Sequence, residues 1–134
     1  MIVVFDASTF ISAALKVDSI PERALLRAVS GPNRLILSSE VEAEYREVIF
    51  RPKFDRFVSV ERRQLILDTV IVAAERVEPV EAVLECQDPK DNKYLELAAG
   101  RADVIVSSDA RHLLSMHPWR GILILSPFDF LALP

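Results

Sequence analysis

Short aliphatic runs alternate along the chain with longer segments in which apolar residues recur at helical spacing. Four of the short runs are fully apolar and rich in β-branched residues: 2–5 (IVVF), 35–37 (LIL), 104–106 (VIV) and 122–125 (ILIL). Runs of this kind are typical of strands that are buried on both faces of a parallel sheet. A weaker candidate strand is RVEPV at 76–80.

Helical segments lie between these runs, and two of them begin with a capping pattern. The segment 19–22 (SIPE) has the S-x-x-E form of a capping box and leads into a helix that Gly31 ends. The same form recurs at 39–42 (SEVE), and the apolar spacing over 60–77 predicts a long amphipathic helix. Strands that alternate with helices predict a three-layer α/β/α domain around a mostly parallel sheet.

Composition supports one folded domain over residues 1–134. The chain has 134 residues, of which 51% are hydrophobic and only 3 are Gly, which excludes a disordered chain. The single cysteine, Cys86, is interpreted as a small buried apolar residue, and the lack of a disulfide favours a reducing, cytoplasmic setting. Asp6 interrupts the apolar N-terminus and no apolar run is long enough for a membrane span, so we expect neither a signal peptide nor an anchor.

The charge distribution is uneven. The formal net charge of −4 gives no general reason to bind a polyanion. The segment 51–63 (RPKFDRFVSVERR), however, contains the basic residues Arg51, Lys53, Arg56, Arg62 and Arg63. Two interpretations stay open: these side chains follow a phosphate backbone, or they form the solvated face of a helix.

Carboxylates follow the ends of three predicted strands. Asp6 comes directly after the first run, Asp109 follows the run at 104–106, and Ser38 opens a helix that carries Glu44. Because the carboxyl ends of parallel strands meet at one edge of the sheet, we expect the three acids at one rim. Taken singly, each acid also has a structural interpretation, as a helix N-cap or as a solvated helix carboxylate.

The segment 87–99 (QDPKDNKYLELAA) adds two aspartates with different expected roles. Asp88 precedes a proline and suits the N-cap of a helix, although contact with a second metal ion stays open. Asp91 lies in the apolar stripe of that helix, whereas Lys93 and Glu96 are expected to point away. We therefore interpret Asp88 as the cap and Asp91 as the side chain that faces the rim.

Four carboxylates at one rim would repel one another, and a divalent cation would relieve the repulsion. The set comprises Asp6, Glu44, Asp91 and Asp109. Hard oxygen ligands favour Mg²⁺ or Mn²⁺, and the spacing of His112 and His117 on the chain makes a zinc site improbable. The chain lacks the glycine-rich nucleotide-binding loops and the G-x-S-x-G elbow, so we do not expect those classes of enzyme.

Four segments together resemble the PIN-domain family, and more narrowly its prokaryotic branch of toxins from toxin–antitoxin systems. They are VVFDAST, LSSEVEAEYREVIFRPKF, DPKDNKYLELAAGRADVIVSSDARHLL and ILSPFDFL, in the order of the family over nearly the whole chain. The resemblance implies a Rossmann-like fold and a ribonuclease that uses Mg²⁺ or Mn²⁺. It also implies an RNA substrate, a homodimer and a small antitoxin protein as partner.

The resemblance also assigns residues. Position by position, the acids of the family match Asp6, Glu44, Asp91 and Asp109. Ser8 and Ser107 match polar positions, and they are implied to hydrogen-bond the metal ligands or a phosphate oxygen. Where relatives often have Thr-Gly-Asp, this chain has Ser-Ser-Asp, which retains a hydroxyl at Ser107.

Two other classes of protein stay open. A phospho-receiver domain also gathers acids at strand ends, but it needs a lysine after the last strand and an aspartate after a central one. This chain has Ser126 and Ser38 at those places. A catalytically silent module of the same fold, which binds RNA or a protein, is the stronger alternative, although the presence of all four acids argues against it.

Overall fold

The central sheet of the computed structural model, which describes all 134 residues, is entirely parallel. Its strands are β1 (Ile2–Phe5), β2 (Arg34–Leu37), β3 (Glu75–Arg76), β4 (Val104–Val106) and β5 (Leu123–Leu125). They lie in the order β3-β2-β1-β4-β5, so β1 occupies the centre and the chain builds one half of the sheet on each side of it. The predicted α/β class and its parallel sheet are confirmed.

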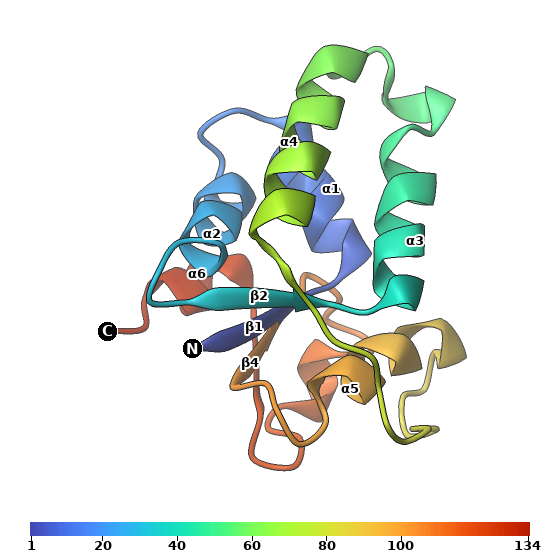
Figure 1. Cartoon of the computed structure of the whole chain (residues 1–134), viewed down its shortest axis with the longest axis vertical. Helices are drawn as coiled ribbons and strands as arrows, with labels where there is room; N and C mark the ends of the chain where they lie inside the picture. Colours follow the sequence, from blue (N-terminus) through green and yellow to red (C-terminus); the bar gives the residue numbers. More distant parts are fainter.

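Helices cover both faces of this sheet. The α-helices are α1 (Ala7–Leu15), α2 (Ile20–Ala28), α3 (Ser39–Ile49), α4 (Val60–Ala73), α5 (Asn92–Ala98) and α6 (Pro127–Leu131). Short 3₁₀ helices are η1 (Pro52–Phe54), η2 (Pro89–Asp91) and η3 (Leu114–Met116). Figure 1 shows α1, α3 and α4 on one side of the sheet and α5 on the other, which is the predicted three-layer arrangement.

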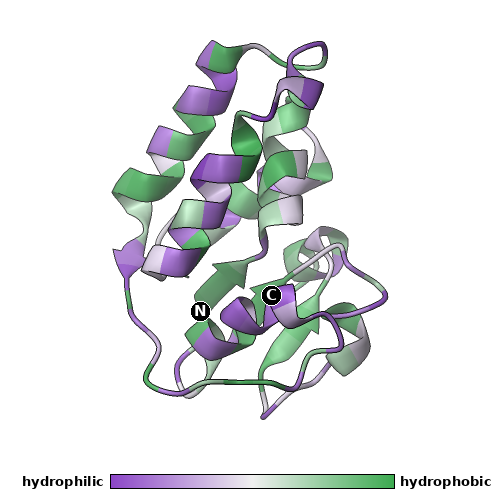
Figure 2. Ribbon diagram, turned by 90° about the vertical axis from the view of Figure 1, so that its right-hand side faces the viewer, coloured by the Kyte–Doolittle hydropathy of each residue, from purple (hydrophilic) through white to green (hydrophobic).

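The core forms where the apolar runs predicted it. The residues of β1 after Ile2, those of β2 after Arg34 and all of β4 are buried. In Figure 2 the central strands are hydrophobic, the edge strand β3 (Glu75–Arg76) is hydrophilic, and the helices carry alternating hydrophobic and hydrophilic bands. Cys86 is buried and free, as expected. No helix has the length and apolar character that a membrane crossing requires.

Two predicted boundaries are wrong. The helix expected over 60–77 ends at Ala73, because the next residues form β3 and pair with β2, and the amide of Val77 donates to the carbonyl of Leu37 at 2.8 Å. The helix α3 is capped by Ser38, whose Oγ accepts from the amide of Val41 at 3.1 Å, and not by Ser39. Ser39 is unavailable since its hydroxyl donates to Glu78 at 2.7 Å.

The basic segment 51–63 does not form one surface. Arg63 is only 1% exposed, and it donates to the carbonyl of Ile49 at 3.1 Å and to Asp55 at 2.7 Å. Arg62 turns toward α1 and α2, where it pairs with Glu22 at 2.5 Å. These two arginines hold helices together, so only the first half of the segment leaves basic side chains in contact with solvent.

Candidate functional site

The carboxyl ends of β1 and β4 form the point at which the sheet divides. After β1 the chain turns to β2 on one side, and after β4 it turns to β5 on the other. In open parallel sheets a crevice lies at such a point and receives ligands. The residue that follows β1 is Asp6 and the one that follows β4 is Ser107, and the amide of Asp6 donates to the carbonyl of Val106 at 3.1 Å.

Asp6 lies in this crevice and is held there by three donors. Its Oδ1 caps α1 by accepting from the amide of Thr9 at 2.9 Å, and it also accepts from the hydroxyl of Ser8 at 3.2 Å. Its Oδ2 accepts from the hydroxyl of Ser107 at 2.5 Å. Burial raises the pKa of Asp6, which is only 3% exposed, and the hydrogen bonds from Ser107 and Thr9 oppose that rise. Capping and a place in the site are therefore compatible for this residue.

Asp109 follows β4 and organises the turn after it. Its amide donates to Ser107 Oγ at 3.0 Å, and its Oδ1 accepts from the amides of Arg111 and His112 at 3.1 and 3.2 Å. Its Oδ2 lies 2.8 Å from Nδ1 of the His112 ring. Burial alone would raise the pKa of Asp109, but the hydrogen bonds from His112 and Arg111 outweigh it and lower the pKa. The same contact raises the pKa of His112.

Asp88 and Asp91 enter the crevice from η2, a 3₁₀ turn that precedes α5. Asp88 Oδ1 caps this turn by accepting from the amide of Lys90 at 3.0 Å, as the following proline predicted. Asp91 stands at the start of α5 but makes no capping hydrogen bond. Burial, the contact with Asp109 and the charges of Asp88, Asp109 and Asp6 raise the pKa of Asp91 to about 7. The crowding of these carboxylates is therefore a property of the fold.

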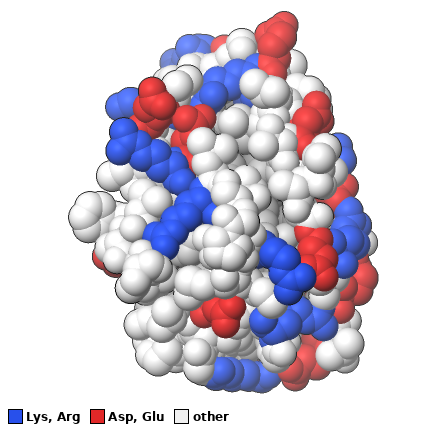
Figure 3. Space-filling model, turned by 60° about the vertical axis from the view of Figure 1, so that its left-hand side comes forward, with Lys and Arg blue, Asp and Glu red and all other residues white.

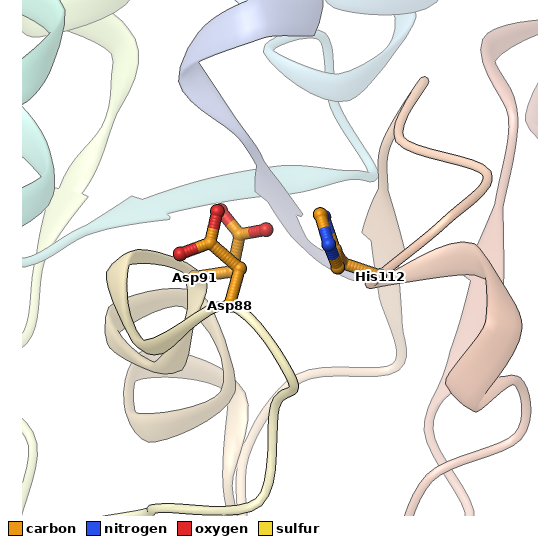
Figure 4. Close-up of side chains that lie close together, drawn as sticks. All are labelled: Asp88, Asp91 and His112. Atoms are coloured by element: carbon orange, nitrogen blue, oxygen red, sulfur yellow. The ribbon is translucent and has the colours of Figure 1, made fainter.

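His112 belongs to this group, although the sequence prediction considered it only as a zinc ligand together with His117. One ligand atom from each of Asp88, Asp91 and His112 lies within 4.8 Å of the others. Figure 4 shows the two carboxylates side by side with the imidazole ring facing them from the segment after β4. The prediction examined the spacing between His112 and His117. The useful signal was the spacing of three residues after Asp109, which lets the ring return to that carboxylate.

Glu44 lies on α3 and contacts α5 directly. Its carboxylate accepts from the ammonium group of Lys93 and from the hydroxyl of Tyr94. The Tyr94 oxygen in turn accepts from the amide of Ala7 at 2.9 Å, so Glu44 is linked to the first turn of α1. The expectation that Lys93 points away is wrong, because α5 packs against α3 and brings this cation onto Glu44.

Glu96 does not point freely into solvent either. It is half-buried, and its Oε2 accepts from the amide of Val83 at 2.9 Å. The segment before η2 therefore packs along α5, and it covers the face of the helix that the spacing assigned to solvent.

A cavity of about 480 Å³ extends from the acids along α1 and α3. Its acidic lining consists of Glu44, Asp88 and Asp91, and its basic lining consists of Arg51, Lys53 and Lys90. The remaining wall is apolar or small and includes Ile11, Leu15, Val48 and Phe54. A lining that combines acidic, basic and aromatic side chains is suited to a phosphate chain that reaches a metal centre.

The donor set fits a divalent cation. Carboxylate oxygens are the ligands that Mg²⁺ and Mn²⁺ prefer, and one imidazole is compatible with Mn²⁺. The raised pKa of Asp91 shows that negative charge is crowded here, which a cation would relieve. Asp91 lies in contact with Asp109 and beside Asp88 and His112, so it is the residue that an ion in the crevice would share.

Comparison with known proteins gave one match. A family model described as PIN domain matches residues 2–111. This range runs from β1 through Asp109 and ends one residue before His112. No curated protein and no solved structure matched the chain.

Proposed function

The chain belongs to the PIN domain family, whose members are generally nucleases, and from this premise we propose that it is a metal-dependent endoribonuclease that hydrolyses RNA phosphodiester bonds. The observation that carries the proposal is the group of carboxylates at the division of the sheet, where burial and, after it, the neighbouring acids raise the pKa of Asp91 to about 7. Crowded acids in a crevice are costly to the fold, and a functional site is the usual reason for such a group.

Asp6, Asp91 and Asp109 would hold Mg²⁺ or Mn²⁺ in this proposal. Asp88 and His112 would lie beside the ion, next to Asp91. The ion supplies Lewis-acid chemistry that activates water and offsets the charge of the phosphate during hydrolysis. Ser8 and Ser107 keep the carboxylate of Asp6 oriented through their hydrogen bonds. The ring of His112 fixes Asp109 in the same way.

Glu44 has a separate part in the proposal. Its ion pair with Lys93 and its hydrogen bond from Tyr94 fix α3 against α5, beside the cavity that α1, α3 and η2 line. The substrate strand would run along this cavity, with the basic side chains Lys53 and Lys90 next to its phosphates. Because Glu44 also lines the cavity, it is placed to reach the metal through a water molecule.

We also propose that the protein is the toxin of a toxin–antitoxin pair, acting in the cytoplasm as a homodimer with a small antitoxin as partner. The support for this finer statement is the resemblance of four segments to that branch of the family. Purification of the chain with the product of a neighbouring gene, followed by growth assays with each alone, tests it.

A catalytically silent module of the same fold is the second candidate function. The observation in its favour is that Glu44 is bound by Lys93 and Tyr94, while Asp6 is buried and accepts three hydrogen bonds. In such a module these acids would serve only to stabilise the crevice.

Cleavage of a panel of structured RNAs with Mg²⁺ or Mn²⁺, with and without EDTA, separates the two candidates. We expect cleavage by the wild type and by Asp68→Asn, an exposed aspartate on α4 that serves as the matched control. Asp6→Asn and Asp91→Asn should lose activity by at least a factor of about 100, since each removes a charged ligand of the metal. Equal cleavage by the wild type and Asp91→Asn would overturn the site, and no cleavage by any protein would favour the silent module.

A further inference from the structure

We infer that residues 51–57 (RPKFDRF), hereafter the strap, bind unpaired nucleotides of the substrate strand next to the acidic crevice. This inference rests on the proposed nuclease function. It assigns a second binding site, built from aromatic and basic side chains, to the part of the chain between α3 and α4.

The strap presents two pairs of a cation and an aromatic ring. The guanidinium carbon of Arg56 lies 4.8 Å from the centre of the Phe57 ring, and the ammonium nitrogen of Lys53 lies 5.2 Å from that of Phe54. Phe57 is 60% exposed, so its ring is open to a ligand. Rings beside cations form the surface on which nucleic-acid bases stack while the cations meet the phosphates.

The backbone of the strap is held in place by the core of the protein. The amide of Phe57 donates to the carbonyl of Phe54 at 3.0 Å, and the next residue, Val58, is buried. The buried Arg63 holds the strap against the core, because it donates hydrogen bonds both to Asp55 in the strap and to the carbonyl of Ile49 at the end of α3. A surface that is ordered before it binds loses little conformational entropy when the ligand arrives.

The strap and the crevice share one groove. Arg51, Lys53 and Phe54 line the same cavity as Asp88, Lys90 and Asp91. A strand whose phosphate lies at the acids would therefore place a neighbouring nucleotide over the strap. Because bases are available for stacking only when they are unpaired, this geometry selects single-stranded over duplex substrate.

The charges of the strap are available to a ligand. Lys53, Arg56 and Lys90 form no ion pair with an acidic side chain, whereas Arg51 pairs with Glu47 at 2.6 Å. Elsewhere the charges are mixed: on the face that Figure 3 shows, basic and acidic side chains alternate around an uncharged area. Charge complementarity thus favours an anionic strand at the strap over a second protein chain.

Binding without cleavage tests the inference. A fluorescently labelled RNA of 12 nucleotides, about the span of one binding groove, is titrated with protein in EDTA, alone and annealed to its complement, with fluorescence anisotropy as the readout. We expect tighter binding of the single strand and about a tenfold loss of affinity for Phe57→Ala, but near wild-type affinity for Phe57→Trp. Phe128→Ala is the matched control, since Phe128 is 66% exposed and belongs to α6, which contributes no residue to the cavity, whereas the strap contributes Arg51, Lys53 and Phe54.

The base analogue 2-aminopurine gives a second readout that a purely structural role would not change. Its fluorescence should be quenched when it stacks on the wild-type protein and not on Phe57→Ala. The inference is overturned if Phe57→Ala binds as tightly as the wild type, or if the wild type binds duplex and single strand equally. A wild type that binds no RNA also overturns it, and that result would favour a protein partner at the strap.

The outcome for the strap is separable from the outcome for the nuclease proposal. Asp91→Asn should still bind the single strand in EDTA, although it should not cleave RNA when metal is present. A wild type that does not cleave RNA, but whose binding is weakened only by Phe57→Ala, would thus overturn the nuclease proposal alone. Normal cleavage by the wild type, together with unchanged RNA affinity of Phe57→Ala, would overturn the inference about the strap alone.

Discussion

The hydroxyl of Ser107 donates a hydrogen bond to the carboxylate of Asp6 at 2.5 Å, across 101 positions of the chain. This bond joins the ends of β1 and β4, where the sheet divides, and it lies in the interior. A buried carboxylate that loses a donor is penalised because water cannot replace the bond.

Ser107→Ala should therefore lower the free energy of unfolding by about 1–3 kcal/mol, while Ser107→Thr should retain most of the stability because it keeps the hydroxyl. Urea denaturation in EDTA measures both variants. Equal loss in the two would show that the packing of the residue, and not its hydroxyl, matters. In metal titrations Ser107→Ala should also bind Mn²⁺ more weakly, since Asp6 is no longer held in place.

Asp91 should make stability depend on pH. Its pKa of about 7 in the folded protein is above the ordinary value of 3.8, so the folded state binds a proton more tightly than the unfolded state. The free energy of unfolding should fall as the pH rises from about 4 to about 7, by about 2 kcal/mol after allowance for solvent screening of this half-buried group.

The contribution of Asp91 is measured by denaturation of the wild type and Asp91→Asn at pH 5 and pH 8 in EDTA. The wild type should lose more stability between the two pH values than the variant does. Addition of Mg²⁺ or Mn²⁺ at pH 8 should restore the wild type and leave Asp91→Asn nearly unchanged. The same pH dependence in both proteins would contradict the assignment.

Tyr94 should contribute strongly to the free energy of unfolding, because its hydroxyl forms hydrogen bonds with two other helices. It donates to Glu44 on α3 and accepts from the amide of Ala7 at the start of α1. Tyr94 is only 1% exposed, so Tyr94→Phe leaves polar groups unpaired and should cost about 2 kcal/mol. A double-mutant cycle with Glu44→Gln measures the coupling of the pair, and a coupling energy of zero would contradict the contact.

Substitution of two arginines in the segment 51–63 should change the stability of the fold to very different extents. Arg63→Ala removes the buried partner of Asp55 and of the Ile49 carbonyl, and it should cost about 3 kcal/mol of unfolding free energy. Arg56→Ala changes only an exposed side chain and should alter stability by less than about 0.5 kcal/mol. Thermal unfolding measures both, and similar destabilisation by the two would mean that Arg56 also supports the fold.

The strand pattern predicted most of what brings Asp6, Ser107 and Asp109 together. Fully apolar runs identify buried parallel strands, and the residues that follow such strands share one edge of the sheet whatever the details of packing. The order of the strands was not needed for that conclusion. It decided only that β1 and β4 are neighbours, which makes the hydrogen bond between Asp6 and Ser107 possible.

Contacts that depend on how helices pack were beyond the reach of the sequence. The partner of Lys93 depends on the approach of α3 to α5, which the spacing along one helix does not reveal. The long side chains of Arg62 and Arg63 reach polar groups on other helices, so their position in a basic run did not reveal that they are buried or half-buried. His112 was left out of the predicted site because its spacing was compared with that of His117, and not with that of Asp109 three residues before it.

The central position of β1 has a consequence for the chain as it is being made. Asp6 leaves the ribosome about 100 positions before its neighbours Ser107 and Asp109. A chain that ends between them therefore carries the first acid without the strand that completes the crevice. Whatever chemistry the acids perform is withheld from that nascent polypeptide, and it begins only after Ser107 and Asp109 have been synthesised.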